Sequence, residues 1–377
     1  MSEHPADGTP QRPRIRVAVV FGGRSSEHAI SCISAGSVIS ALDSAKYEVV
    51  PIGITTDGRW VLESTENGRL ALGPGGELPS VSGDREVTLS PSADVVVHEP
   101  GEVPTRLGEV DVVFPVMHGP WGQDGTLQGL LELSGVRYVG AGVLSSAVGT
   151  DKMFMKLLFA AQGLPVLPWV LVRPGAWQGD RAAISEAVSS LGYPVFVKPA
   201  RAGSSFGISR VDRAEDLGAA IEEAQRFDPK VLVEAAALGA REVEIGVIGD
   251  PDGGAPLTSA IAEIRVDAAH EFYDFEAKYL PEQNTALEVP ADLDEAVAGK
   301  VRRFAREAFA ALDVEGLARV DFFVFEDGRV VLNEVETMPG FTATSMFPRM
   351  WAASGVEYPE LLDRLIALAM ARGTGLR

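Results

Sequence analysis

The sequence predicts mixed α/β and α+β structure, with a parallel α/β domain at the N-terminus followed by two further lobes. Its 377 residues exceed what one ordinary hydrophobic core accommodates and suit two or three packed domains. Apolar strands alternate with helical spacing up to about residue 140, as in a parallel sheet flanked by helices. Longer strands separated by turns dominate the last third of the chain, as in an antiparallel sheet.

The first domain is predicted over residues 15–140. The segment 15–23 has the β-branched composition of a buried strand and ends in a glycine turn, and 31–44 has helical apolar spacing. Further elements of the predicted parallel sheet are strands at 47–54, 94–100 and 111–117, with a helix at 126–133. The Gly- and Pro-rich segment 72–91 is expected to be a surface insertion.

Residues 141–234 predict a small α+β lobe, and residues 235–377 predict a third, antiparallel domain with a helical layer. In the lobe we expect helices at 151–162 and 182–191 and strands at 168–172, 194–199, 207–211 and 230–234. In the third domain we expect strands at 241–249, 257–266, 316–325 and 329–335 and helices at 294–312 and 358–371.

Composition argues against several classes of protein. Residues 1–14 are rich in Pro and polar residues and lack the apolar stretch of a secretory signal, which predicts a disordered tail. No apolar run approaches the roughly 18 residues of a membrane helix, so no membrane association is expected. A net charge of −20 would repel a phosphate backbone, which argues against nucleic acid as a partner. The single Cys32 cannot form an internal disulfide, which agrees with the reducing cytoplasm.

A lysine followed by a glycine-rich loop predicts a phosphate-binding site in residues 196–207. Lys198 lies at a strand end, and Ser204 and Ser205 follow it between two glycines. Backbone N–H groups and hydroxyls of such a loop can turn toward phosphates, and glycine permits a close approach. The alternative is a tight hairpin turn with solvent-exposed serines, and the loop alone leaves both interpretations open.

Four charged residues on two neighbouring strands predict a divalent cation site. Arg319 and Asp321 share one strand face, and Glu334 and Glu336 can share the facing one after a hairpin turn. Three carboxylates packed together would repel one another without a cation, and Mg²⁺ commonly binds one or two carboxylates plus nucleotide phosphates. The alternative is a set of polar residues on a solvated strand face.

The segment 21–31 joins a strand to a helix. Its glycines do not match the spacing G-x-G-x-x-G, which argues against a Rossmann dehydrogenase. Glu27 near the helix N-terminus either favours the helix dipole or holds a substrate ammonium group. Taken alone, His118 is more typical of a core or turn histidine than of a catalyst, and Lys278 is typical of a solvated lysine.

The order of these segments resembles the D-alanine:D-alanine ligase family. They are GGRSSEH, HGPWGQDGTLQG, DK, VKPARAGSSFG, FYDFEAKY, RVDFF and NEVETMPGFT, and the resemblance runs from about Arg16 to the C-terminus. It implies a three-domain ATP-grasp fold in which the lobes at 141–234 and 235–377 clamp ATP while the N-terminal domain closes the D-amino-acid site. It also implies a cytoplasmic, homodimeric, ADP-forming ligase that joins two D-alanines through D-alanyl phosphate for peptidoglycan synthesis.

The same resemblance implies a nucleotide site with two Mg²⁺ or Mn²⁺ ions. Phosphate contacts are expected from Lys152, Lys198, Ser205 and Lys278. Glu234 is expected at the adenine amino group and Glu242 at the ribose. The expected metal ligands are Asp321, Glu334 and Glu336.

The resemblance also implies the residues that bind and activate D-alanine. The expected catalytic residues are Glu27, Ser204, Tyr279, Arg319 and Gly340, and Glu27, Ser204 and Tyr279 correspond to a triad that tethers a loop over the site. The expected substrate-binding residues are Glu27, His118, Arg319, Gly340, Ser345 and Met346. Glu27 is expected at the ammonium group of the first D-alanine, and Ser345 with the Met346 backbone at the carboxylate of the second.

Two positions depart from the family pattern, and three alternative functions stay open. Gln123 stands where the family usually has Glu, and Glu336 where it usually has Asn. The alternatives are a D-alanine:D-lactate ligase, a ligase of other small D-amino acids, and a degenerate ATP-grasp protein that binds nucleotide without turnover. The pair Lys278 and Tyr279 favours an amino acid as second substrate, and the complete set of lysines and carboxylates argues against degeneration.

Overall fold

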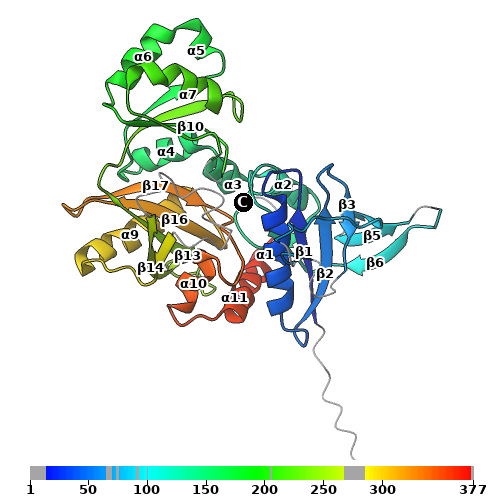
Figure 1. Cartoon of the computed structure of the whole chain (residues 1–377). Helices are drawn as coiled ribbons and strands as arrows, with labels where there is room; N and C mark the ends of the chain where they lie inside the picture. The colour runs from blue at the N-terminus through cyan, green and yellow to red at the C-terminus, as the bar shows by residue number, and fades with distance from the viewer. Residues whose placement is uncertain are drawn as a thin grey trace, which may run out of the picture.

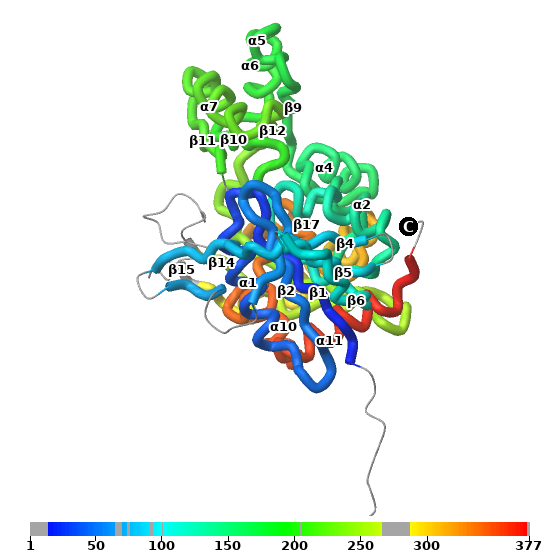
Figure 2. Tube along the Cα trace, turned by 90° about the vertical axis from the view of Figure 1, so that its right-hand side faces the viewer, coloured from blue at the N-terminus to red at the C-terminus, as the bar shows by residue number. Residues whose placement is uncertain are grey.

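The computed structural model of the protein describes residues 14–64, 70–73, 76–90, 93–99, 101–203, 206–266 and 285–374. The described residues form three sheets with their helices (Figure 1). The sheet containing β10 stands above the other two with helices α5–α7, and the view turned by 90° in Figure 2 agrees. Most of the predicted N-terminal tail, together with Ser204, Ser205, Lys278 and Tyr279, lies outside the described residues.

The first sheet has eight strands in the order β6-β5-β4-β3-β2-β1-β7-β8. Its parallel half consists of β2 (Tyr47–Ile54), β1 (Ile15–Gly22), β7 (Val112–Val116) and β8 (Arg137–Tyr138). Its antiparallel half is formed by β3 (Trp60–Leu62), β4 (Glu86–Leu89), β5 (Asp94–His98) and β6 (Thr105–Glu109), which extend from β2. Helices α1 (His28–Ala41) and α2 (Thr126–Leu133) belong to the parallel half.

The prediction of an all-parallel sheet in the first domain was therefore wrong for the strand at 94–98. This strand, β5, follows β4 after only four residues, and a connection that short can join only antiparallel neighbours. The segment 72–91 is also more than a surface insertion, because it contains β4.

The second sheet is a small antiparallel one in the order β11-β10-β12-β9. Its strands are β9 (Trp169–Val172), β10 (Val195–Pro199), β11 (Ser209–Val211) and β12 (Val231–Ala235). The accompanying helices are α5 (Ala176–Gly179), α6 (Arg181–Ser189) and α7 (Leu217–Ala224). All four predicted strands and the helix at 182–191 are confirmed, whereas α7 was not predicted. The domain limits drawn from the sequence stay predictions.

The third sheet is antiparallel in the order β15-β14-β13-β16-β17. Its strands are β13 (Arg241–Ile248), β14 (Leu257–Val266), β15 (Thr285–Glu288), β16 (Leu317–Val324) and β17 (Val330–Glu336). Helices α4 (Lys152–Ala161) and α9 (Glu295–Ala311) share an apolar core with one face of this sheet. Helix α3 (Val143–Thr150) precedes α4, and α10 (Met346–Ala352) contacts β13 and β14.

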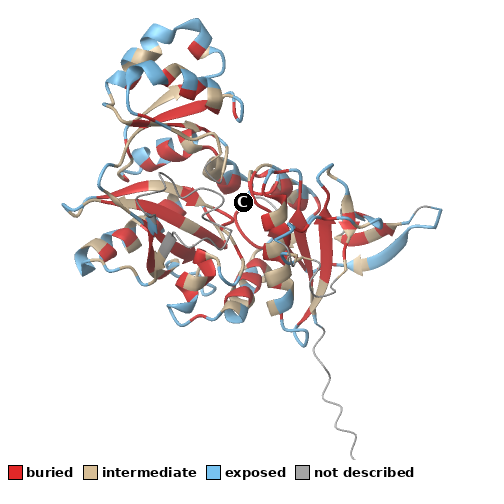
Figure 3. Ribbon diagram, viewed as in Figure 1, coloured by how far each residue is buried: buried red, intermediate tan, exposed pale blue. Residues whose placement is uncertain are grey.

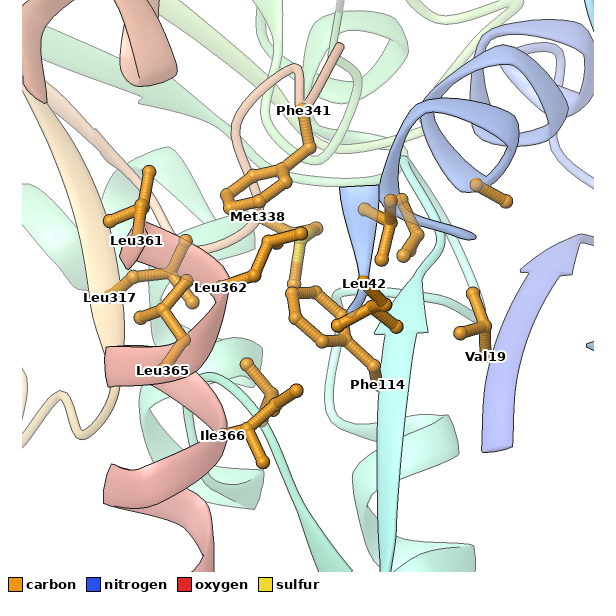
Figure 4. Close-up of a cluster of buried hydrophobic side chains, with 14 of the residues drawn as sticks. Val19, Leu42, Phe114, Leu317, Met338, Phe341, Leu361, Leu362, Leu365 and Ile366 are labelled. Atoms are coloured by element: carbon orange, nitrogen blue, oxygen red, sulfur yellow. The ribbon is translucent and has the colours of Figure 1, made fainter. Parts of the chain in front are cut away.

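The C-terminal helix α11 (Tyr358–Ala371) joins the third sheet to the first. Its buried side chains, among them Leu362 and Ile366, face Phe114 of β7 and Leu317 of β16 in one hydrophobic cluster (Figure 4). Figure 3 shows buried residues along this junction, whereas the outer surfaces of the upper helices are exposed. The two sheets are therefore held in a fixed relation by apolar packing.

A β-bulge in β17 decides which residues of this strand face the cavity. Asp321 pairs with Glu334 and the next residue, Phe322, pairs with Leu332, which leaves Asn333 as the extra residue. An uninterrupted strand would direct Leu332 and Glu334 to the same face. Because of the bulge, Leu332 enters the core under α9 while Glu334 lines a cavity on the other side.

We predict that Gly316→Ala destabilises the junction between the first and third sheets. Gly316 has a φ of +76°, and a Cβ there would lie 2.9 Å from the backbone of Gly140. Because both the left-handed backbone and the contact oppose a side chain, we expect a loss of about 1–3 kcal/mol in the free energy of unfolding, measured in urea. The control is Gly299→Ala in α9, where no atom lies within 4 Å of the new Cβ and alanine should stabilise by about 0.5–1 kcal/mol. Equal effects at both glycines would contradict the close packing at Gly140.

Candidate functional site

A cavity of about 400 Å³ is lined by residues from all three sheets. Glu27 and His118 come from the loops that follow β1 and β7, at the carboxyl ends of two parallel strands. Lys198 and Glu234 come from β10 and β12, and Arg319 comes from β16. The volume suits a small ligand, and ligands of α/β sheets bind outside the carboxyl ends of strands.

Two predicted phosphate lysines lie in this cavity, and each is paired with a carboxylate. Lys152 begins α4, where its Nζ lies 3.4 Å from Glu334 Oε2 and donates to the Ala202 carbonyl at 3.1 Å. The Nζ of Lys198 donates to Glu234 Oε2 at 2.7 Å. Burial alone would raise the pKa of Glu234, but the neighbouring lysines outweigh it and hold that pKa below its usual value.

The position of Lys152 depends on a buried ion pair that the sequence did not indicate. Asp151 caps α4 by accepting hydrogen bonds from the backbone N–H groups of Met153 and Phe154. The same carboxylate accepts hydrogen bonds from Lys230 Nζ at 2.6 and 2.8 Å. The start of α4 is thus tied to the strand β12, which begins one residue after Lys230.

The charged residues predicted on β16 and β17 face each other across the two strands. Arg319 lies opposite Glu336, and Asp321 lies opposite Glu334. The Arg319 guanidinium donates to both oxygens of Asp321, at 2.8 and 2.7 Å. On the neighbouring strand β13, Glu244 lies opposite Asp321, and its Oε2 is 3.4 Å from Arg319 Nε.

This wall of the cavity carries an excess of negative charge. Burial raises the pKa of Glu336 to about 7; Arg319 opposes that rise, and Glu334 and Glu27 add to it. Burial would lower the pKa of Arg319, but Asp321 and Glu244 keep it well above its usual value. A cation is therefore the kind of ligand that this wall favours.

Glu27 and His118 close the side of the cavity formed by the first sheet. Glu27 is buried, and a Cβ on Gly203 would lie 3.5 Å from its Oε2, so the loop after β10 reaches it. His118 Nδ1 donates to the Met338 carbonyl at 3.1 Å, and its Nε2 lies 3.3 Å from the Ser34 hydroxyl. Burial lowers the pKa of His118 despite the opposing charge of Glu27, so the ring is neutral. Because both ring nitrogens have protein partners, the histidine links the first sheet to the loop after β17.

The other predicted site residues divide into three groups. Glu242 and Gly340 line the cavity. Ser345 and Met346 are not among the lining residues: the Ser345 hydroxyl accepts from Thr342 N–H at 3.1 Å, and the Met346 side chain is buried in the core. Outside the described residues are Ser204, Ser205, Lys278 and Tyr279.

Sequence reasoning missed two residues for which weak signals exist. Glu244 follows Glu242 by two residues, which on a strand places both on one face. Lys156 follows Lys152 by four residues on α4, which places both on one helix face, and its Nζ forms an ion pair with Glu234.

Comparisons with known proteins agree with the sequence motifs. A family model for the D-ala D-ala ligase N-terminus matches residues 16–141, and one for the D-ala D-ala ligase C-terminus matches residues 158–367. The chain is 57% identical to a D-alanine–D-alanine ligase of Kineococcus radiotolerans, covering 97% of this chain and 99% of that one. It is 56% identical to a D-alanine–D-alanine ligase of Streptomyces griseus subsp. griseus, covering 98% and 96%. The crystal structure of the VanG D-Ala:D-Ser ligase from Enterococcus faecalis is similar with a TM-score of 0.80 and 33% identity, covering 95% of this chain and 100% of that one.

We predict that Lys230→Met lowers the free energy of unfolding by about 3 kcal/mol, because it leaves the Asp151 carboxylate buried without its cation. Adding Asp151→Asn, which retains a capping side chain, should recover part of this loss. Arg213→Met is the control, since Arg213 pairs with acidic residues on the surface and should cost less than about 1 kcal/mol. Urea unfolding measures all three variants, and a Lys230→Met protein as stable as the control would show that the pair does not anchor α4.

Proposed function

The chain belongs to the D-alanine–D-alanine ligase family, and we propose that the cavity between its three sheets binds ATP, divalent cations and two D-alanines. The protein is an ATP-dependent, ADP-forming carbon–nitrogen ligase that joins two D-alanines for peptidoglycan synthesis, and its fold is the ATP-grasp fold. One observation carries the assignment of the site: Lys152, Lys198, Arg319 and Glu27, singled out by separate motifs, line a single cavity.

The nucleotide is proposed to bind between β10, β12 and β13. Lys152 and Lys198 are proposed to take its phosphates, and the fact that both residues line the cavity supports this. Lys278 and Ser205 are proposed as further phosphate contacts. Glu234 and Glu242 are proposed at the adenine amino group and the ribose, respectively. When the nucleotide binds, its phosphates must replace the carboxylates that pair with these two lysines in this structure.

Asp321, Glu334 and Glu336 are proposed to hold two Mg²⁺ or Mn²⁺ ions. Their carboxylate oxygens suit hard divalent cations, and Asp321 and Glu334 lie opposite each other on neighbouring strands. Among the described residues no three acidic, histidine or cysteine side chains are gathered as a complete metal site. Mg²⁺ usually takes one or two carboxylates and completes its shell with phosphate oxygens and water. When bound, the cations would offset the charge of the transferring phosphoryl group.

The remaining residues are proposed to position the amino acids. Glu27 holds the ammonium group of the first D-alanine, whose carboxylate attacks the γ-phosphate to give D-alanyl phosphate and ADP. The neutral amine of the second D-alanine then attacks the acyl carbon, loses a proton and expels phosphate. Arg319 and the Gly340 N–H stabilise the oxyanion of that step, because both residues line the cavity and can donate hydrogen bonds to it.

Two further assignments complete the substrate site. Ser345 and the Met346 backbone are proposed to receive the carboxylate of the second D-alanine, which requires the loop before α10 to approach the cavity. Glu27, Ser204 and Tyr279 are proposed to tether a loop that keeps water from the acyl phosphate. Gly203, the residue before Ser204, lies close to Glu27, and this supports a contact between Glu27 and the proposed loop.

The second substrate distinguishes the proposed reaction from its alternatives. The test is phosphate release and product analysis with ATP, D-alanine and a panel of D-amino acids and D-hydroxy acids. We expect D-alanyl-D-alanine as the main product. A dominant depsipeptide with D-lactate would identify the D-alanine:D-lactate reaction, and nucleotide binding without turnover would identify a degenerate member.

No described helix is long and apolar enough to cross a membrane. The cytoplasm is the proposed location, because that is where ATP is available.

We predict that Asp321→Asn and Glu334→Gln each lower kcat for divalent-dependent phosphate release by roughly 100-fold or more, because each removes a charged metal ligand worth several kcal/mol. Glu334→Gln should change the free energy of unfolding little, whereas Asp321→Asn also removes a charged partner of the buried Arg319 and should lower it, so kcat is compared on folded protein. Glu326→Gln is the matched control, since Glu326 is exposed in the turn between β16 and β17. Activity of either site variant close to that of the control would place the cations elsewhere.

A homodimer is proposed, with exposed apolar side chains on three consecutive helices as its interface. Leu133 of α2, Leu144 of α3 and Phe154 of α4 are 85%, 64% and 51% exposed, and α3 packs against both α2 and α4. An apolar surface of this kind marks a protein interface.

We predict that Leu144→Glu converts the dimer to a monomer in light scattering, because a carboxylate would be buried at the interface. Val103→Glu is the control, since Val103 is equally apolar and 84% exposed on the β5–β6 connection. A Leu144→Glu protein that stays dimeric would exclude this surface, and a monomeric parent protein would exclude the dimer itself.

A further inference from the structure

Lys156 is a buried charge that the proposed reaction does not use. It lies on α4 with 1% of its side chain exposed, and it is not among the residues that line the cavity. Its Nζ forms an ion pair with Glu234 Oε1 and lies 3.4 Å from the Asn333 carbonyl at the bulge of β17. Burial of an ammonium group costs free energy, and its partners must offset that cost.

Glu234 is shared between two lysines on opposite sides. Its Oε1 pairs with Lys156 beneath the cavity, and its Oε2 accepts a hydrogen bond from Lys198 in the cavity at 2.7 Å. Only 1% of the Glu234 side chain is exposed, so water cannot replace either partner. The Glu234 carboxylate therefore pairs with two ammonium groups, and a ligand in the cavity can reach the one on Lys198.

The two lysines have different freedom to change partners. Lys156 has no route to the ligand, because it is enclosed between α4, Glu234 and the bulge of β17. Lys198 lines the cavity and is 13% exposed. If Glu234 had Lys198 alone, detaching that lysine would leave a buried carboxylate without a cation, which is strongly unfavourable.

We propose that Lys156 is a positioning residue, a permanent counter-ion of Glu234 that allows Lys198 to exchange this carboxylate for a nucleotide phosphate. The inference rests on the proposed nucleotide site. Lys156 keeps Glu234 ionised and paired throughout, so the phosphate contact of Lys198 does not carry the cost of an unpaired buried charge. Lys156 also contacts the bulge next to Glu334. It therefore connects the proposed nucleotide site to β17, the strand that carries two of the proposed metal ligands.

The test compares ADP with adenosine, which lacks phosphates, by calorimetry without divalent cations. In Lys156→Met we expect ADP affinity to fall about ten-fold relative to adenosine, because Lys198 stays bound to Glu234. In Glu234→Gln, which removes the buried charge, adding Lys156→Met should leave the ADP-to-adenosine ratio unchanged. Lys300→Met is the control for loss of one lysine, since Lys300 is exposed on α9.

Two outcomes would overturn the inference. An unchanged ADP-to-adenosine ratio in a folded Lys156→Met protein, whether both affinities are kept or both fall equally, would mean that Lys156 only stabilises the fold. If Lys156→Met does not fold, the two variants containing Glu234→Gln decide, and a ten-fold fall of the ratio between them contradicts the role of Glu234. A parent protein that binds no ADP would instead refute the proposed nucleotide site itself.

Discussion

A buried carboxylate needs cations or hydrogen-bond donors to offset the loss of water, and around one cavity this protein supplies cations from different structural elements. Lys152 of α4 lies beside Glu334 of β17, and Lys198 of β10 donates to Glu234 of β12. Apolar packing through α11 holds the first and third sheets in place, while these ion pairs fix the side chains between them. The shape of the cavity therefore depends on charge pairing as much as on the hydrophobic core.

The paired residues are also those proposed to contact ligands. In the proposed site, phosphates would compete with Glu334 and Glu234 for the two lysines, and cations would compete with Arg319 for Asp321. Binding of nucleotide and metal together can then replace each lost ion pair with a new one, so no charge is left unpaired. Residues that keep their ion pair when ligands bind, such as Lys156 with Glu234, make that exchange possible.

Local pattern was sufficient to predict the main strands of the three sheets, and motif order singled out several residues that line the cavity, among them Lys152 and Arg319. Ser345 and Met346 were also expected at the site, but they are not among its lining residues. The β-bulge at Asn333 was beyond reach, because it depends on the register with β16 and not on the composition of β17. The ion pair of Asp151 with Lys230 joins residues 79 positions apart, and nothing in either segment indicates the other. The antiparallel strands β3–β6 were missed or misassigned, because short half-buried strands resemble parallel ones in composition.

If the ion pairs of the unliganded protein are exchanged for ligand contacts, a crystal structure with a non-hydrolysable ATP analogue and Mg²⁺ should show the exchange. We expect Lys198 Nζ at a phosphate oxygen, Glu234 still paired with Lys156, and Asp321 at a cation instead of Arg319. A bound nucleotide beside an unchanged Lys198–Glu234 contact of 2.7 Å and an unchanged Arg319–Asp321 pair would contradict it.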